Sequence, residues 1–448
     1  MRKSYFWLGF LFAIALAVGS TNAQTAPLYF PPTSGAAWAT TAPASLGWCQ
    51  PPLDSLLAFA GRKGSKSLLI LKDGRLVVER YYGTYTADSV HYWASAGKTL
   101  VAALVGVAQQ DGLLNINDST SRFLGRGWTT APPAKERLIT VRHQLTMTTG
   151  LNDLLPPTPQ VPDPDNCLQP ACLQYLADAG TRWAYYNGPY RLLQNVVANA
   201  SGMPFQQYTR QRLGNRIGMA GFWFDYTYYS RARDMARFGL LVLARGSWNG
   251  TPVLTDPAYF QAMTTPSQTL NRSYGYLWWL NGQSSHKLPG PQQTTFPGPL
   301  VPAAPADMIA ALGKDDQKIY VVPSLGLVVV RQGSSAGGRS MALSSFDNEL
   351  WTKIMAVLYR PTAAAAAAEA AGFLAFPNPA AETLTLRQPA QSAAAVRLLD
   401  GLGREVVRQR TAAPETTVAV NALAPGLYTA QWLDHAGRVL ASRKVARQ

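Results

Sequence analysis

The chain has 448 residues, of which 47% are hydrophobic and 15% are charged. This balance is typical of a globular protein with a large core and excludes wholesale disorder. Lysine and arginine outnumber aspartate and glutamate by 40 to 25, for a formal net charge of +15. Because the basic residues are scattered and form no blocks, we interpret them as a solvated basic surface and expect no nucleic-acid partner.

The first residues have the pattern of an export signal. Arg2 and Lys3 precede the apolar run 5–19, and small residues at 21–23 fit cleavage after Ala23. The run is shorter than the ~20 residues of a spanning helix, so we favour a cleaved signal peptide, residues 1–23, over an uncleaved anchor. No later segment is long and apolar enough to span. We therefore expect no integral membrane span and a mature protein outside the cytoplasm.

Two apolar runs, 68–71 and 76–82, are joined through an Asp-Gly pair. An Asp-Gly turn between such runs predicts a β-hairpin. The apolar stretch 98–110, ended by a second Asp-Gly pair, predicts a helix. Ser95 lies just before this helix and Lys98 lies in its first turn.

Ser95 and Lys98 are a candidate nucleophile and base. A serine attacks a carbonyl only if a base takes its proton, and a lysine can do so when burial or a nearby cation lowers its pKa. Residues three apart share a helix face, and free N–H groups at the helix start favour negative charge there. The alternative is a capping serine followed by an exposed lysine. A second Ser-x-x-Lys, at Ser284 and Lys287, is followed by Pro-Gly-Pro and is interpreted as a loop.

A second motif lies downstream, where Tyr185 and Asn187 stand two apart before a predicted helix. In an extended segment such residues point the same way and can face one cleft. Beside Lys98, the Tyr185 phenol would be partly ionised and relay protons, while Asn187 would tie Lys98 to the substrate. The alternative is aromatic packing at a helix start.

The cysteines and histidines give weaker signals. Cys167 and Cys172 flank four residues of a polar loop, close enough for a small disulfide in an oxidising compartment. Cys49 is interpreted as a buried thiol. The histidines have no metal-ligand spacing, so we expect no metal and no organic cofactor.

Helical patterns dominate from about 98 to 245, and strand-like runs return afterwards. These runs are Ser273–Leu280, Met308–Leu312, Lys318–Val322 and Leu327–Arg331, and a last helix fits Asp347–Tyr359. Strands at both ends around a helical middle predict an α+β fold: an antiparallel sheet flanked by helices, plus a helical subdomain. The aromatic residues at 274–280 fit either the lining of an apolar pocket or a core strand.

The order Ser95-x-x-Lys98, then Tyr185-x-Asn187, resembles the serine β-lactamase and penicillin-binding-protein superfamily over roughly residues 40–360. The resemblance is to its class C branch, which includes esterases and 6-aminohexanoate-dimer hydrolases. It implies that Ser95 forms an acyl-enzyme, with Lys98 and Tyr185 moving the proton and Asn187 orienting them.

The family's third motif, Lys-Thr-Gly or a variant, is altered here to Ala311-Leu312-Gly313. Gly313 would let backbone approach the substrate, and an N–H near Lys314 would join that of Ser95 as the oxyanion hole. In penicillin-recognising members the motif's lysine attracts a substrate carboxylate, which Ala311 cannot do. The resemblance therefore implies neutral substrates, with Arg331 and Lys314 as candidates to replace the cation and keep a β-lactam substrate open.

An alanine-rich stretch, residues 361–373, predicts a linker, and short strands with turn signals at 374–448 predict a small β-sandwich. Its Phe376-Pro377-Asn378-Pro379 and the closing Arg443-Lys444-Val445 resemble a type IX secretion C-terminal sorting domain. That implies a partner in the secretion machinery and a place outside, or on the surface of, a Gram-negative cell. A carbohydrate-binding or fibronectin-like module is the alternative.

These observations predict a secreted serine hydrolase, residues 24–360, that cleaves ester or amide bonds of small neutral substrates without a cofactor. The alternatives are β-lactamase or D,D-peptidase activity, and a non-catalytic cell-surface binding protein on the same fold.

Overall fold

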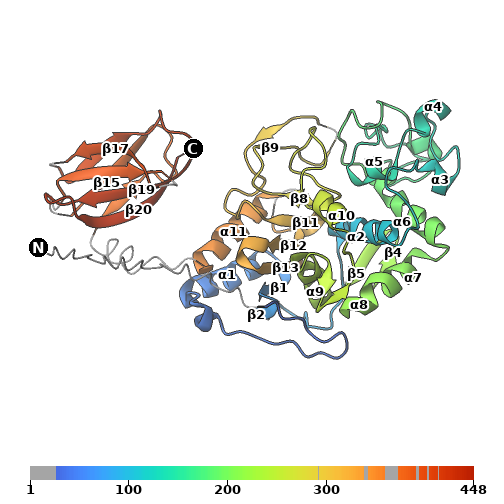
Figure 1. Ribbon diagram of the computed structural model, residues 1–448, viewed down its shortest axis with the longest axis horizontal. Coiled ribbons are helices and arrows are strands. Elements are labelled where there is room, and N and C mark those ends of the chain that lie inside the picture. Colours follow the sequence, from blue (N-terminus) through green and yellow to red (C-terminus); the bar gives the residue numbers. More distant parts are fainter. Residues whose placement is uncertain are drawn as a thin grey trace, which may run out of the picture. The chain divides into compact units, whose positions relative to one another are not determined.

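The computed structural model describes residues 27–290, 292–337, 342–358, 372–389, 393–400, 403–411 and 413–447 (Figure 1). The chain divides into two compact units, one of residues 1–42 with 57–352 and one of residues 43–56 with 353–448. The predicted signal peptide and residues 361–371 of the predicted linker lie outside the described residues.

A six-stranded antiparallel sheet is the centre of the first unit, in the order β2-β1-β13-β12-β11-β8. Its strands are β1 (Ser65–Lys72), β2 (Arg75–Tyr81), β8 (Trp279–Leu280), β11 (Ile309–Gly313), β12 (Gln317–Val322) and β13 (Leu327–Gly333). The N-terminal hairpin β1–β2 pairs with β13 from the other end of the unit. Strands from both ends therefore build one sheet, which confirms the predicted α+β fold.

Helices cover both faces of this sheet. Neighbouring strand residues point to opposite faces, and in β12 Ile319 lies under α9 (Ala232–Leu243) while the Tyr320 ring packs edge-on against Trp351 of α11 (Ser345–Leu358). Helix α9 lies so close that a Cβ on Gly239 would be 2.5 Å from Val328 Cγ1. The last predicted helix is α11, shifted by one or two residues at its ends.

The helical region holds α2 (Gly97–Gln110), which is buried over nearly its whole length and packs on α6 (Asn187–Ser201). Such a helix is apolar on every side, which matches its sequence. The other helices are α1 (Gln50–Arg62), α3 (Ser121–Leu124), α4 (Pro133–Glu136), α5 (Val141–Leu145), α7 (Phe205–Thr209), α8 (Asn215–Ile217) and α10 (Pro257–Met263).

Two short strands, β4 (Gly221–Phe224) and β5 (Thr227–Ser230), interrupt the region predicted to be helical, residues 98–245, and further short pieces lie outside it. Together with β3 (His91–Tyr92), these two strands form a small sheet in the order β3-β5-β4. Three further pieces are the pairs β6 (Ser247–Trp248) with β7 (Thr251–Pro252) and β9 (Ser285–His286) with β10 (Phe296–Pro297), and the 3-10 turn Ala94–Ala96.

The predicted strand Ser273–Leu280 is wrong over most of its length. Only Trp279–Leu280 is a strand, and Leu277 has a φ of +60°, which turns the chain back so that Tyr274 bridges to Trp279. The large side chains of this turn are nonetheless buried. Burial of a compact turn gives the same apolar pattern as a core strand.

The second unit contains two antiparallel sheets that share one core, which confirms the small β-sandwich. One sheet has the order β14-β15-β18 and the other β17-β16-β19-β20. The strands are β14 (Leu374–Phe376), β15 (Thr383–Arg387), β16 (Ala395–Leu399), β17 (Glu405–Arg410), β18 (Glu415–Ala419), β19 (Gly426–Leu433) and β20 (Val439–Arg447). Trp432 is fully buried in this core and packs against Phe373.

Candidate active site

Ser95 lies in the tight turn between the small sheet and helix α2. Strand β3 is paired with β5, and Trp93 is fixed there by its backbone N–H to Tyr228 O and its indole N–H to Ser230 Oγ, both at 2.8 Å. Ala94 then takes a φ of +48°, a left-handed conformation that costs a non-glycine residue roughly 1–2 kcal/mol. This strained residue reverses the backbone directly before the serine, as is common at functional sites.

Lys98, one turn into α2, lies beside Ser95 and is 1% exposed. Its Nζ donates to Ser95 Oγ at 3.0 Å and to Asn187 Oδ1 at 2.7 Å. The Tyr190 and Tyr185 rings lie 4.0 and 4.7 Å from the same nitrogen. The first and second sequence motifs are therefore brought together around one amine.

The surroundings of Lys98 favour its neutral form. Burial lowers the pKa of its ammonium from 10.5 to about 7, opposed by the charge of Asp165 and assisted by that of Arg191. An amine with this pKa is partly unprotonated at neutral pH and can accept the proton of a serine hydroxyl.

Tyr185 differs from the sequence prediction in its charge. Burial raises the pKa of its phenol well above the usual range, although Ser95 lies near enough to oppose part of the shift. Partial ionisation of the Tyr185 phenol beside Lys98 is therefore wrong: the lysine is the group that is partly deprotonated, and the phenol keeps its proton. Among the described residues the buried hydroxyl has no hydrogen-bond partner of ordinary geometry, so its proton is available to a substrate.

Asn187 is held from behind by a carboxylate. Its side-chain Nδ2 donates to Asp165 Oδ2 at 2.6 Å and its backbone N–H donates to Asp165 Oδ1 at 3.0 Å. With Nδ2 engaged there, Oδ1 faces the Lys98 amine. Although Asp165 is an exposed residue, the protein around its carboxylate raises its pKa, against the hydrogen bonds from Asn187 and the charge of Lys98.

A cavity of about 250 Å³ opens over these groups. Its lining includes predicted site residues together with aromatic and basic side chains: Tyr92, Ala94, Ser95, Lys98, Asn166, Asn187, Tyr190, Arg191, Thr227, Tyr229 and Lys314. The volume admits a small acyl or alcohol group, and one wall is aromatic.

The end of strand β11 borders the nucleophile turn. A Cβ on Gly313 would lie 2.5 Å from Trp93 O and 3.0 Å from Ala96 N, so only glycine lets this strand come so close. Lys314, the next residue, lines the cavity with Ser95. The two chain segments expected to form an oxyanion hole are therefore adjacent, and the pairing of their N–H groups on a substrate remains a prediction.

Arg331 cannot serve as the replacement cation. It is fully buried, and its guanidinium donates to the carbonyl oxygens of Asp315, Asp316, Lys63 and Ser334 and to Ser65 Oγ. Burial also lowers the pKa of this group. Of the two proposed replacements, Lys314 alone lies at the cavity.

Comparison with known proteins identifies the family of the chain. The family model described as Beta-lactamase matches residues 59–339, more than half of the chain. The chain belongs to the beta-lactamase family. The model described as Secretion system C-terminal sorting domain matches residues 374–445, the predicted sandwich.

Individual relatives are distant. A Bacillus subtilis (strain 168) protein named "Putative penicillin-binding protein PbpX" is 26% identical over 202 residues, 43% of this chain and 48% of that protein. The aligned segment thus spans about half the length of that curated relative.

Solved structures show the same fold. "Putative 6-aminohexanoate-dimer hydrolase from Bacillus anthracis" superposes with a TM-score of 0.56 and 17% identity, over 72% of this chain and 88% of that one. "EstCE1, a hydrolase with promiscuous acyltransferase activity" gives 0.52 and 13%, over 71% and 99%.

Several residues of this family member's site have weak sequence signals. Tyr190 follows Asn187 by three on one helix face, a spacing that a search around the second motif would have found. Arg191 follows Asn187 by four, which is also a same-face spacing on this helix. Asp165 carries no such signal, because a loop brings it to Asn187. Within the part of the chain that the structure describes, no group of three His, Cys, Asp or Glu residues is placed to hold a metal ion.

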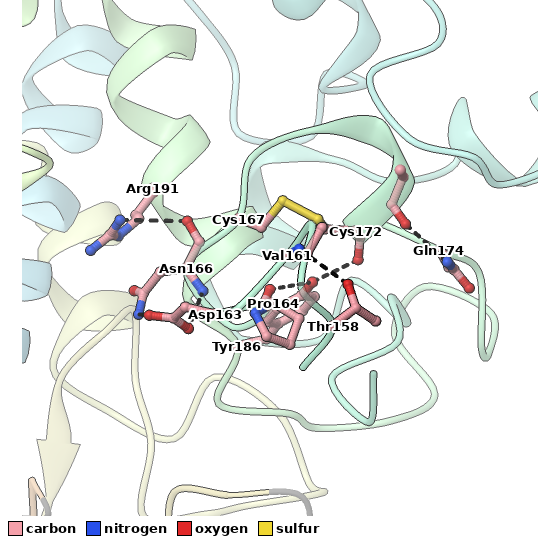
Figure 2. The surroundings of a disulfide bond; sticks show 11 residues. Thr158, Val161, Asp163, Pro164, Asn166, Cys167, Cys172, Gln174, Tyr186 and Arg191 are labelled. Atoms are coloured by element: carbon pink, nitrogen blue, oxygen red, sulfur yellow. Dashed lines mark hydrogen bonds between the residues drawn. A yellow bond between two sulfur atoms is a disulfide. The ribbon is translucent and has the colours of Figure 1, made fainter. Parts of the chain in front are cut away.

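The cysteines of the neighbouring loop are bonded. Cys167 and Cys172 form a disulfide that closes the segment between them (Figure 2). The Tyr186 hydroxyl donates to Cys172 O at 2.8 Å, which ties this loop to the residue before α6.

Replacing Lys98 by Met tests its burial through stability. Wild-type stability is expected to rise with pH between about 7 and 10.5, because only the unfolded chain holds the Lys98 proton there. Lys98→Met removes that slope, so the variant should be a few kcal/mol more stable relative to wild type at the low-pH end than at the high-pH end. Denaturant unfolding at both ends measures it, and equal differences would contradict the lowered pKa.

Proposed function

We propose that this protein is a secreted serine hydrolase that cleaves ester or amide bonds of small neutral substrates through an acyl-enzyme on Ser95. The observation that carries the proposal is the fully buried Lys98 amine 3.0 Å from Ser95 Oγ, with a pKa lowered to about 7. A structural lysine would keep its charge in water, whereas this one is held where it can act as a base.

Acylation begins when neutral Lys98 takes the proton of the Ser95 hydroxyl and Oγ attacks the substrate carbonyl carbon. The carbonyl π electrons move to its oxygen, and backbone N–H groups near Ser95 and Lys314 hold the oxyanion. When the carbonyl re-forms, the bond to the leaving oxygen or nitrogen breaks. The leaving group gains a proton from the Tyr185 hydroxyl, which Lys98 then replaces.

Deacylation repeats these steps with water. The amine removes a proton from water, hydroxide adds to the acyl carbon, and Ser95 leaves with a proton as the acid is released. Asn187 keeps the amine aligned in both halves, because its Oδ1 accepts from Lys98 at 2.7 Å. The residues named suffice for both steps, so the proposal invokes no cofactor.

Two features favour neutral substrates. Ala311, at the place of the third-motif lysine, is buried and uncharged, and Arg331 is engaged by backbone oxygens. The cavity wall is also aromatic: Tyr229 lines it, and the half-exposed Phe222 stacks on Tyr229 with ring centroids 5.3 Å apart. A neutral acyl chain or ring fits this surface better than a charged one.

A second candidate function is hydrolysis of β-lactams or of D,D-peptides, both of which carry a carboxylate. The observation that favours it is the pair Lys314 and Arg191, two basic side chains that line the cavity together with Ser95. Two cationic side chains beside a nucleophile can bind an anionic group.

The C-terminal sorting domain supports export through the cell envelope, in keeping with the predicted signal peptide. We propose that it directs type IX secretion to the medium or the cell surface. Of the helices that the structure describes, none is both long enough and apolar enough to cross a membrane.

The nucleophile is tested with a fluorophosphonate probe on the full chain. We expect labelling of wild type and its loss in Ser95→Ala, because the buried Lys98 amine lies 3.0 Å from Ser95 Oγ and can take its proton. Ser284→Ala is the matched control, since it removes the other Ser-x-x-Lys serine, and should label normally. Absent labelling of folded wild type, or full labelling of Ser95→Ala, contradicts the proposal.

Substrate class is tested by comparing a short-chain nitrophenyl ester with nitrocefin. The ester should have the higher kcat/KM, and its kcat/KM should rise with pH through about 7 as Lys98 loses its proton. Efficient nitrocefin turnover would favour the second candidate, and Lys314→Ala with Arg191→Ala would then raise KM for nitrocefin more than for the ester.

Export is tested by deleting residues 374–448 in the native host. The protein should then be retained in the cell, most of it in the periplasm, and be depleted from medium and surface as measured by immunoblotting of fractions. Undiminished secretion of the truncated chain would contradict the sorting role.

A further inference from the structure

The loop that carries Asp165 is fastened to the start of α6 at several points. Besides the Tyr186 contact to Cys172 O, a Cβ on Gly188 would lie only 2.8 Å from Cys167 O, so the bridged loop rests directly on the first turn of the helix. Figure 2 shows Asn166 between Asp163 and Arg191: it donates to the carboxylate, and its carbonyl accepts from the guanidinium.

From this loop a line of polar contacts leads to the nucleophile. The Asp165 carboxylate accepts from Asn187 Nδ2 at 2.6 Å, Asn187 Oδ1 accepts from Lys98 Nζ at 2.7 Å, and Nζ lies 3.0 Å from Ser95 Oγ. Asp165, at the far end of this line from Ser95, fixes which group donates and which accepts in each contact. A carboxylate can only accept, so it decides which end of the Asn187 amide faces Lys98.

A purely structural role for Asp165 explains half of this geometry. A carboxylate that accepts the backbone N–H of Asn187 stabilises the N-terminal turn of α6, as capping residues do. The second oxygen is not needed for that purpose, yet it binds the side chain that touches Lys98. The shorter of the two contacts is the one directed at the active site.

We propose that Asp165 is a positioning residue of the Ser95–Lys98 site, and that the Cys167–Cys172 disulfide holds its carboxylate against Asn187. The same carboxylate fixes the orientation of the Asn187 amide. It also places a negative charge near the Lys98 amine, with only the Asn187 side chain between them. Asp165 positions Asn187 and Lys98 whether or not the protein turns over a substrate. The effect of Asp165 on a reaction rate rests on the proposed function.

The charge of Lys98 depends on few groups. Asp165 acts on it from the loop, two residues before the bridged Cys167, and Arg191 acts from α6, with opposite signs. Tyr185 and Tyr190 face it with their rings, and Ser95 and Asn187 with neutral polar atoms. Lys314 lines the same cavity from the end of β11. Since Asp165 is the one group that stabilises the ammonium by charge in this set, its loss must lower the pKa of Lys98.

The experiment titrates Lys98 directly in the full chain. Lysine labelled with ¹³C at the ε carbon gives a signal that is assigned by its absence in Lys98→Ala. In Asp165→Asn the midpoint of this signal should fall below that of wild type, because a negative charge has gone. Asp165→Glu, which restores the charge, should return it toward wild type. A carboxylate that capped α6 without acting on Lys98 would change thermal stability on removal and leave the midpoint in place.

The disulfide is tested by the double variant Cys167→Ser and Cys172→Ser, with Cys49→Ser as the matched control. The double variant should shift the midpoint in the direction of Asp165→Asn by a smaller amount, since the charge is still present but less firmly held. Cys49→Ser should titrate as wild type does. Because the double variant keeps Asp165 itself, it carries the test if Asp165→Asn does not fold.

Catalysis supplies the second readout. For nitrophenyl ester hydrolysis, Asp165→Asn should lower kcat by up to about a hundredfold, with a smaller effect on KM, and move the acid limb of the pH profile to lower pH. An unchanged titration midpoint together with kcat within twofold of wild type overturns the positioning role. If instead the midpoint shifts but wild type neither labels nor hydrolyses esters, the positioning stands and the proposed function fails.

Discussion

An amine kept out of water beside a serine hydroxyl is the constraint on which the rest of this site depends. Lys98 sits on a helix that is apolar on nearly every face, so the chain has little choice but to bury it. In water a lysine holds its proton to about pH 10 and is useless as a base. The packing of α2 against α6 and the sheet is therefore what gives the amine its chemistry.

Burial of the amine opposes folding, and the contacts around it offset only part of the free energy lost when it leaves water. Two tyrosine rings lie against the amine, and two oxygens accept from it. These contacts stabilise the ammonium without the full strength of an ion pair, because Asp165 reaches it only through Asn187. A direct salt bridge would hold the proton and abolish the base, whereas no carboxylate at all would lower the pKa further and weaken it as a base.

Local pattern foretold much of this from the sequence. The Asp-Gly turn predicted β1–β2, the apolar stretch predicted α2, and the order of Ser95, Lys98, Tyr185 and Asn187 predicted residues that lie together. Prediction from the sequence failed where the conformation or protonation state of a residue depends on its three-dimensional surroundings. Leu277 reverses a segment whose burial imitates a strand, and the charge of Tyr185 follows from how deeply its hydroxyl is buried, which spacing does not reveal. Asp165 is an ordinary loop aspartate until the disulfide and Gly188 place it behind Asn187.

The altered third motif shows how the same charges can serve the fold instead of the substrate. Lys318 is fully buried against Asp316 and Asp347, and Arg331 gathers the carbonyls of Asp315 and Asp316. Asp315 and Asp316 both have a φ near +60°, so the turn after β11 is strained. The contacts from Lys318 and Arg331 support this turn. Lys318 and Arg331, two basic side chains close to the motif, therefore point inward and hold the turn that positions Lys314. A cation locked into that task cannot also meet a substrate, so any recognition of anions here must come from the cavity rim and not from the strand.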